Sequence, residues 1–244
     1  MKILRTIKRN IPNTITCLNL ASGVLACIYA LRSDETFGVL QGYHVSFLLI
    51  AVAAIFDFCD GLSARLLGAV SAIGKELDSL SDSVSFGLAP SLLVFTLLET
   101  AAPHSWIKYL AVIVAVCGVV RLARFNTDAT QKVSFLGLPI PANAIFWIGF
   151  CAWQYEHMEL LEGNNIWWLV ALIVAMSLMM VCRLRMFSLK IKNLSWSGNW
   201  PRFLIVGIAI ILIAIQGIPG MATTIVAYII LSALTHRRTK RLES

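Results

Sequence analysis

The stretch DFCDGLSARLLGAVSAIGKELDSLSD, residues 57–82, places four aspartates at the junction between two long apolar segments. These segments cover residues 43–64 and 78–98, so two aspartates close the first segment and two open the second. A membrane-spanning helix needs about 20 mainly apolar residues, and a carboxylate in or near the hydrocarbon costs about 2.5–3.5 kcal/mol. Four carboxylates at one membrane boundary therefore indicate a functional site.

The rest of the chain continues the apolar pattern. Of its 244 residues, 58% are hydrophobic and 14% charged, and the mean hydropathy is +0.79, which excludes a soluble, disordered or disulfide-stapled protein. Six further apolar segments cover residues 13–31, 106–123, 138–155, 165–182, 200–216 and 218–234. We therefore expect an all-α polytopic membrane protein with about eight transmembrane helices in a single domain over residues 1–244.

Glycine and proline indicate two local features of these helices. GIPG at residues 217–220 predicts a tight turn between the last two helices. Gly87 and Pro90 are expected to loosen the third helix, because proline removes a backbone hydrogen bond.

Basic side chains are distributed unevenly between the two sides that eight spans would define. Eighteen of the twenty Lys and Arg fall on the side of the N-terminus, whereas the other side holds Arg32 and Lys108. Cytoplasmic segments of membrane proteins are enriched in Lys and Arg, so both termini and the four aspartates are predicted to face the cytoplasm. The net charge of +7 then reflects contact with anionic lipid, with no nucleic-acid partner. We expect an integral protein of the cytoplasmic (inner) membrane.

The spacing of the aspartates places them on two helix faces. Asp57 and Asp60 are three residues apart, and Gly74, Asp78 and Asp82 follow at steps of four. Two antiparallel helices joined by a short loop can therefore direct all four carboxylates into one cleft. Because adjacent anions repel one another, the cleft favours divalent cations, and carboxylate ligands suit magnesium, manganese or calcium better than zinc or copper.

Small residues and one arginine lie among the aspartates. Gly61, Ala64 and Gly74 let a ligand or a neighbouring helix approach closely. Arg65 can bind a phosphate through two hydrogen bonds, or it serves only as a topology charge. Metal-bound carboxylates beside an arginine are typical of phosphoryl transfer, so this pattern predicts metal-dependent chemistry on a phosphate at the membrane surface.

The same stretch resembles the motif of the CDP-alcohol phosphotransferase family, D-x2-DG-x2-AR-x8-G-x3-D-x3-D. All of its fixed positions are present, at Asp57, Asp60, Gly61, Ala64, Arg65, Gly74, Asp78 and Asp82. The resemblance implies an integral membrane enzyme with a six-helix core, here about residues 10–182, and an additional helical hairpin over about residues 200–234. It also implies a homodimer.

The resemblance further implies a role for each motif position. Two divalent ions, Mn2+ or Mg2+, would be held by Asp57, Asp60, Asp78 and Asp82, and Asp82 would also deprotonate the acceptor alcohol. CDP-diacylglycerol would be bound by Gly61, Ala64, Arg65 and Gly74. On the first helix, Pro12, Asn13, Thr16 and Asn19 are candidates to line the nucleotide site, and an ordinary helix start explains these four residues equally well. The acceptor oxygen would attack the phosphorus that carries the lipid, and CMP would leave.

Four further stretches resemble the branch of this family that uses L-serine as acceptor. They are PNTITCLN (12–19), SDSVSFGLAP (81–90), RLARFN (121–126) and FLGLPIPANA (135–144). In physical terms, the serine carboxylate needs a cationic partner, and Arg121 and Arg124 share a helix face near a predicted cytoplasmic end. Either arginine is a candidate for the serine carboxylate or a lipid phosphate, and the alternative is a topology charge.

Two other functions stay open at this point. Another member of the family would use glycerol 3-phosphate, inositol phosphate or choline, and a phosphorylated acceptor would need more cations than the two arginines supply. A divalent-cation transporter would distribute its carboxylates near the membrane midplane on several helices. Aspartates at two span ends instead favour transfer of the phosphatidyl group from CDP-diacylglycerol to L-serine, giving phosphatidylserine and CMP.

Overall fold

The computed structural model describes most of the chain. It gives the backbone of residues 2–127, 134–161, 165–187 and 196–241, and the side chains of residues 10–127, 136–161, 165–187 and 200–235. The basic side chains near the N-terminus and in the C-terminal tail, on which part of the orientation argument rests, lie outside this range. The chain forms two compact units, Met1–Val116 and Cys117–Ser244.

Eight helical rods run through the described residues, as the eight apolar segments predict. The helices long and apolar enough to cross a membrane are Asn10–Leu31, Gly42–Leu66, Ala72–Ala101 and Trp106–Thr127, and shorter apolar helices follow. The chain is therefore a membrane protein. In addition to the helices, two antiparallel pairs of strands are present, which the sequence did not predict because two or three residues are too few for a visible alternation.

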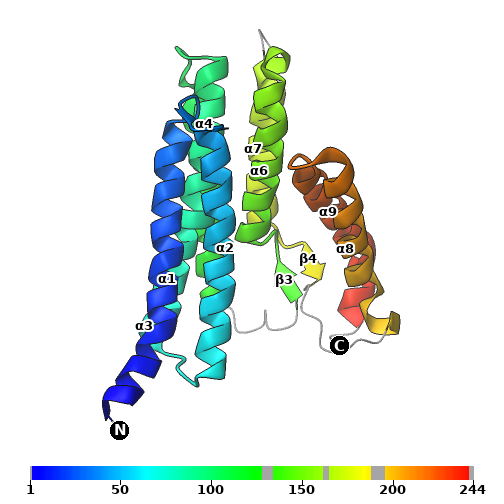
Figure 1. The fold of residues 1–244 in the computed structure, drawn as a ribbon. Coiled ribbons are helices and arrows are strands. Elements are labelled where there is room, and N and C mark those ends of the chain that lie inside the picture. Colours follow the sequence, from blue (N-terminus) through cyan, green and yellow to red (C-terminus); the bar gives the residue numbers. More distant parts are fainter. Residues whose placement is uncertain (1, 128–133, 162–164, 188–195, 242–244) are drawn as a thin grey trace. The chain divides into compact units, whose positions relative to one another are not determined.

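Helix α1 (Lys2–Leu31) is central to the first unit. It packs against α2 (Gly42–Leu66), α3 (Ala72–Asp82) and α4 (Ala89–Ala101), as Figure 1 shows. The strands β1 (Thr36–Phe37) and β2 (Leu40–Gln41) form the turn from α1 to α2.

A close contact and a hydrogen bond hold α1 against α2. At Gly42 any Cβ would collide with the carbonyl of Arg32, so only glycine fits this close approach. The Ser46 hydroxyl donates to the carbonyl of Ala26 at 2.9 Å.

Helix α1 begins at Lys2, upstream of the membrane span expected at residues 13–31, which the structure gives as Asn10–Leu31. The upstream residues include leucine, lysine and arginine, which favour helix, and α1 accommodates Pro12 in its interior. The Thr16 hydroxyl donates to the carbonyl of Pro12 at 3.0 Å, so Thr16 bonds within its own helix.

The third helix also begins earlier than expected, at Ala72 in place of Asp78. Ser71 caps it, because the Ser71 hydroxyl accepts a hydrogen bond from the amide of Gly74 at 3.0 Å. The loosening expected at Gly87 and Pro90 takes the form of a π-helical segment, η1 (Ser83–Leu88), in which the amide of Ala89 bonds to the carbonyl of Val84. Pro90 follows in the first turn of α4, where its missing N–H is tolerated.

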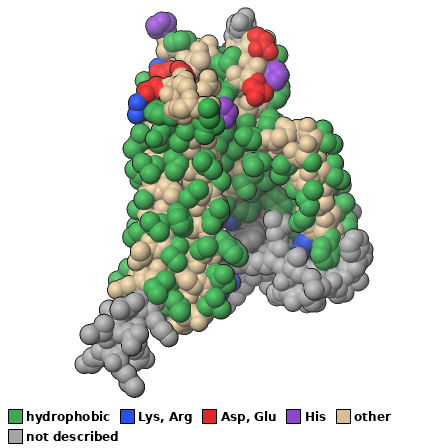
Figure 2. Space-filling model, viewed as in Figure 1, with side chains coloured by type: hydrophobic (Ala, Val, Ile, Leu, Met, Phe, Trp, Pro, Cys, Tyr) green, Lys and Arg blue, Asp and Glu red, His purple; other side chains and the backbone are tan. Residues whose placement is uncertain are grey.

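The outer side of the first unit is apolar. On α2 the exposed side chains include Leu48, Ile55 and Phe58, which are 57%, 60% and 64% exposed. Figure 2 shows apolar side chains along this unit and charged side chains gathered at one end of it. Such a surface is suited to contact with lipid tails.

The helical segment η2 (Trp106–Ala111) continues directly into α5 (Val112–Thr127), which passes from the first unit into the second. The Ser91 hydroxyl of α4 donates to the carbonyl of Ala111 at 2.8 Å and so fixes η2 against α4. Arg121 and Arg124 lie on the part of α5 that belongs to the second unit.

In its described part, the second unit contains four further α-helices, one short 3-10 helix and one strand pair. These elements are β3 (Ser134–Leu136), α6 (Ile140–Glu156), η3 (Met158–Leu161), α7 (Ile166–Val181), β4 (Arg185–Phe187), α8 (Trp196–Gln216) and α9 (Gly220–Arg241). Helix α9 packs against α6, α8 and β4, and a Cβ at Gly149 of α6 would collide with the backbone of Ala222 on α9. The turn between α8 and α9 uses Gly217 with a φ of 67°, as the GIPG sequence predicts.

Candidate active site

Three carboxylates form a compact acidic cluster in the first unit. One oxygen each from Asp57, Asp60 and Asp78 lies within 4.8 Å of the other two. Asp57 and Asp60 come from one face of α2, and Asp78 comes from α3. A short connection makes this possible: Gly68 adopts a φ of 59°, a left-handed conformation that favours glycine and lets the chain reverse after α2.

The acidic cluster has the properties of a site for a hard divalent cation. Asp60 is only 5% exposed, and its Oδ2 has no hydrogen-bond partner among the described residues. Oδ1 of Asp78 is likewise buried without such a partner. Buried carboxylate oxygens are costly unless they are hydrogen-bonded, paired or bound to a metal, so the donor set fits the divalent ion that the sequence implies.

Asp82 lies one turn beyond Asp78 on α3 and does not belong to the group within 4.8 Å. Its Oδ1 accepts a hydrogen bond from the side-chain amide of Asn19, on α1, at 3.4 Å. The four aspartates are therefore not equivalent: three form the acidic cluster, and the fourth has a protein partner.

Two of the residues expected on the first helix lie against the acidic helices. A Cβ at Gly74 would lie 2.9 Å from Oδ1 of Asn13, so the absence of a side chain at Gly74 makes room for Asn13. Thr16 is buried, and its backbone carbonyl accepts a hydrogen bond from the Ser81 hydroxyl of α3 at 3.3 Å. The structure thus places Asn13 and Thr16 of α1 against α3, the helix that carries Gly74 and Asp78.

The expected donor-binding residues on α2 lie near the end of that helix. Gly61 and Ala64 are half-buried, and a Cβ at Gly61 would meet only the Arg65 guanidinium, at 3.9 Å. Arg65 is exposed, and its Nε donates to the carbonyl of Gly61 at 2.8 Å. The arginine therefore folds back along its own helix and leaves the rest of its guanidinium accessible.

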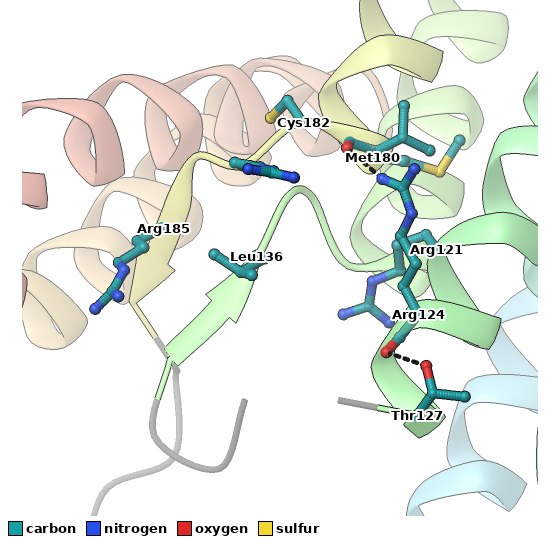
Figure 3. A pocket seen from close by; sticks show the side chains of 9 residues that line it. Arg121, Arg124, Thr127, Leu136, Met180, Cys182 and Arg185 are labelled. Carbon is teal, nitrogen blue, oxygen red and sulfur yellow. Dashed lines mark hydrogen bonds between the residues drawn. The ribbon is translucent and has the colours of Figure 1, made fainter. Parts of the chain in front are cut away.

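The second unit holds a cavity of about 650 Å³ that we call the arginine cavity. Its charged lining residues are Arg121, Arg124, Arg183 and Arg185, and no Asp or Glu is found among its described lining residues. Figure 3 shows Arg121 and Arg124 on α5, with Leu136 and Arg185 on the two strands across from them. This concentration of guanidinium groups suits an anionic ligand.

Contacts with the protein hold the α5 side of the arginine cavity in place. Arg121 is 6% exposed, and its guanidinium carbon lies 5.1 Å from the ring centroid of Phe125. Arg124 donates from Nη1 to the carbonyl of Val181, at the end of α7, at 2.9 Å. The arginine pair predicted from the sequence is thus one wall of a built cavity.

Sequence reasoning missed the other wall. Arg183 and Arg185 follow an apolar segment, where a topology charge is the ordinary interpretation of a basic residue. In the sequence, only their two-residue spacing sets these arginines apart, and this spacing does not predict that they lie near α5. The arginine cavity therefore holds two arginines more than the pair that the sequence singled out.

Comparison with known families decides the classification. A family model described as CDP-alcohol phosphatidyltransferase matches residues 9–163, which is more than half of the chain and includes all four aspartates. The chain belongs to this family. The resemblance implied by the aspartate motif is therefore confirmed.

Curated relatives extend this similarity into the second unit. The chain is 31% identical over 235 residues to the CDP-diacylglycerol–serine O-phosphatidyltransferase of Mycobacterium leprae, covering 93% of this chain and 72% of that protein. Proteins of the same name match from Methanocaldococcus jannaschii, with 40% identity over 58% of this chain and 60% of the relative. The protein of that name from Helicobacter pylori is 29% identical, over 90% of this chain and 87% of the relative.

Proposed function

We propose that the chain transfers the phosphatidyl group from CDP-diacylglycerol to the hydroxyl of L-serine, giving phosphatidylserine and CMP. The observation that carries this proposal is the acidic cluster, three carboxylate oxygens within 4.8 Å, in a chain of the CDP-alcohol phosphatidyltransferase family. The choice of serine rests on the curated relatives, which share the name CDP-diacylglycerol–serine O-phosphatidyltransferase.

Divalent ions, two Mn2+ or Mg2+ by the family resemblance, would be held by Asp57, Asp60, Asp78 and Asp82. When bound, such ions neutralise phosphate oxygens and stabilise the leaving group. The buried oxygens of Asp60 and Asp78 without protein partners support this assignment.

Asp82 is the proposed general base. It accepts the proton of the serine hydroxyl as the serine oxygen forms a bond to the phosphorus that carries the lipid. The bond from that phosphorus to the CMP oxygen breaks, and CMP leaves with the electron pair. The separation of Asp82 from the group of three supports a role beyond metal binding, because a base needs a carboxylate that metal does not fully occupy.

CDP-diacylglycerol would lie along the ends of α2 and α3. The proposed contacts are Gly61, Ala64, Arg65 and Gly74, with Asn13 and Thr16 of α1. Support comes from the open space at Gly61 and from the exposed guanidinium of Arg65, which suits a diphosphate.

We assign the serine carboxylate to Arg121 or Arg124 in the arginine cavity. Arg124 is held by the carbonyl of Val181, which prepares it to bind without further ordering. The four arginines also favour one second candidate, an acceptor that carries a phosphate, because two of them exceed what one carboxylate needs.

The excess of Lys and Arg on the side of the N-terminus supports an enzyme of the cytoplasmic membrane whose site faces the cytoplasm. A homodimer is proposed from the family resemblance alone.

The test is CMP release from CDP-diacylglycerol by the purified protein with Mn2+, comparing L-serine, glycerol 3-phosphate, inositol phosphate and choline. We expect release with serine alone and phosphatidylserine as the lipid product. Release with a phosphorylated acceptor would instead support the second candidate. If no acceptor gives CMP release, the proposal that this chain is a phosphatidyltransferase is overturned.

A further inference from the structure

Asn19 of α1 is fully buried, and both ends of its side-chain amide are engaged. Its Nδ2 donates to Oδ1 of Asp82 at 3.4 Å, and its Oδ1 accepts from the Ser85 hydroxyl at 2.7 Å. An ionised carboxylate only accepts hydrogen bonds, so the amide must turn its NH2 group toward Asp82. The Ser85 hydroxyl, on the opposite end, fixes that orientation.

The fold creates this arrangement through the close approach of α1 to the π-helical segment η1. At Gly23 any Cβ would collide with the Ser85 hydroxyl, so glycine lets Ser85 reach α1. The Ser85 hydroxyl also lies 3.2 Å from the backbone carbonyl of Asn19. The wider turn of η1 begins directly after Asp82 and carries Ser85 toward α1.

One turn earlier, Ser81 makes a similar contact without reaching Asp82. It is fully buried, and its hydroxyl donates to the carbonyl of Thr16 on α1 at 3.3 Å. Ser81 and Ser85 therefore both hold α3 and η1 against α1, but only Ser85 also bonds the Asn19 side chain. A comparison of variants at these two serines can therefore distinguish an effect on helix packing from an effect on the orientation of Asp82.

We propose that Asn19 is a positioning residue for Asp82, and that Ser85 holds the Asn19 amide in the required orientation. With Oδ1 of Asp82 bound to Asn19, the Asp82 side chain stays in one rotamer. Its Oδ2 then stays oriented to take the proton of the serine hydroxyl. This inference rests on the proposed function, in which Asp82 takes the proton of the serine hydroxyl.

The test uses the full-length protein in lipid with saturating Mn2+, and measures kcat, the KM for serine, the KM for CDP-diacylglycerol and Tm. We expect Asn19→Leu to lower kcat about a hundredfold and Ser85→Ala about tenfold, with both KM values unchanged, because misplacing a reacting group slows chemistry more than binding. The matched control is Ser81→Ala, for which we expect a kcat within about twofold of the wild type.

The Tm values distinguish positioning from packing. Ser81→Ala removes one buried interhelical hydrogen bond, whereas Ser85→Ala also leaves the buried Oδ1 of Asn19 without its donor. We therefore expect a decrease in Tm for both variants, somewhat larger for Ser85→Ala, and a clear decrease in kcat, measured well below either Tm, for Ser85→Ala alone. Equal kcat values for the two serine variants would overturn the inference. So would a loss of activity in Asn19→Leu or Ser85→Ala that comes from a higher KM for either substrate and not from a lower kcat. The serine comparison decides the matter even if Asn19→Leu does not fold.

The wild-type control keeps this result apart from the proposed function. A wild-type protein that forms no phosphatidylserine overturns the proposed function and the positioning role with it. An active wild type, an inactive Asp82→Asn and a fully active Asn19→Leu overturn the positioning role alone.

Discussion

The acidic cluster of the first unit and the arginine cavity of the second are built in different ways. The aspartates come from 26 consecutive residues, in which α2, a short turn and α3 follow directly. The arginines come from the end of α5 and from the segment after α7, and Arg124 bonds to a carbonyl 57 residues further along the chain. A local motif carries its chemistry in its spacing, whereas a cavity joined from distant segments does not.

The two regions also call for opposite ligands. Buried carboxylates without protein partners favour cations, and clustered guanidinium groups favour anions. Under the proposed function, changes in the acidic region should therefore lower kcat, and changes in the arginine cavity should raise the KM for serine. Each prediction below tests this separation.

Removal of divalent metal has the largest expected effect. Dialysis against a chelator should abolish CMP release, because the proposed reaction depends on the ions that the acidic cluster binds, and added Mn2+ or Mg2+ should restore it. The measurement is the rate of CMP release before chelation, after it and after the metal is returned. In Asp78→Asn, a higher metal concentration should be needed for half-maximal activity. Full activity in the chelated protein would remove the metal from the mechanism.

Asp82→Asn should have the next largest effect. The asparagine amide cannot take the proton of the serine hydroxyl, and loss of a general base lowers rates by about 10²–10⁴-fold. Binding of CDP-diacylglycerol, measured by titration with the unreacted lipid nucleotide, should change little, because the acidic cluster of three aspartates stays intact. A variant with wild-type kcat would show that another group takes the proton.

The contrast between the regions explains what the sequence could predict. The i, i+4 steps of Gly74, Asp78 and Asp82 are correct because α3 is a helix over all three residues. The third apolar segment was expected to start only at Asp78, since Gly74, Lys75 and Glu76 lower the hydropathy of the first turns behind the Ser71 cap. Hydropathy likewise misses the hydrogen bond from Asn19 to Asp82, because 63 residues separate the partners and nothing local records the contact.

In the arginine cavity we expect an effect on substrate affinity. Arg124→Gln should raise the KM for serine about tenfold at nearly constant kcat, because a charge-assisted hydrogen bond to the carboxylate is lost. Arg183→Gln removes a charge outside the RLARFN stretch, and a comparable rise would show that both walls of the cavity serve the acceptor. The control is Arg202→Gln on α8, which does not line the cavity and should leave the KM unchanged. A lower kcat at constant KM would contradict the separation of roles.

The smallest effects should come from two glycines of the acidic region, and they distinguish packing from ligand contact. Gly74→Ala places a Cβ 2.9 Å from Oδ1 of Asn13, so the Asn13 side chain must shift, and this should offset the gain of about 0.5–1 kcal/mol that alanine brings to a helix, leaving Tm no higher than in the wild type. Gly61→Ala meets only the Arg65 guanidinium at 3.9 Å, an ordinary contact, so Tm should stay constant or rise slightly. If the space at Gly61 receives CDP-diacylglycerol, Gly61→Ala should nevertheless raise the KM for that substrate several-fold. An unchanged KM with an unchanged Tm would leave the space at Gly61 without a ligand and place the donor elsewhere along α2.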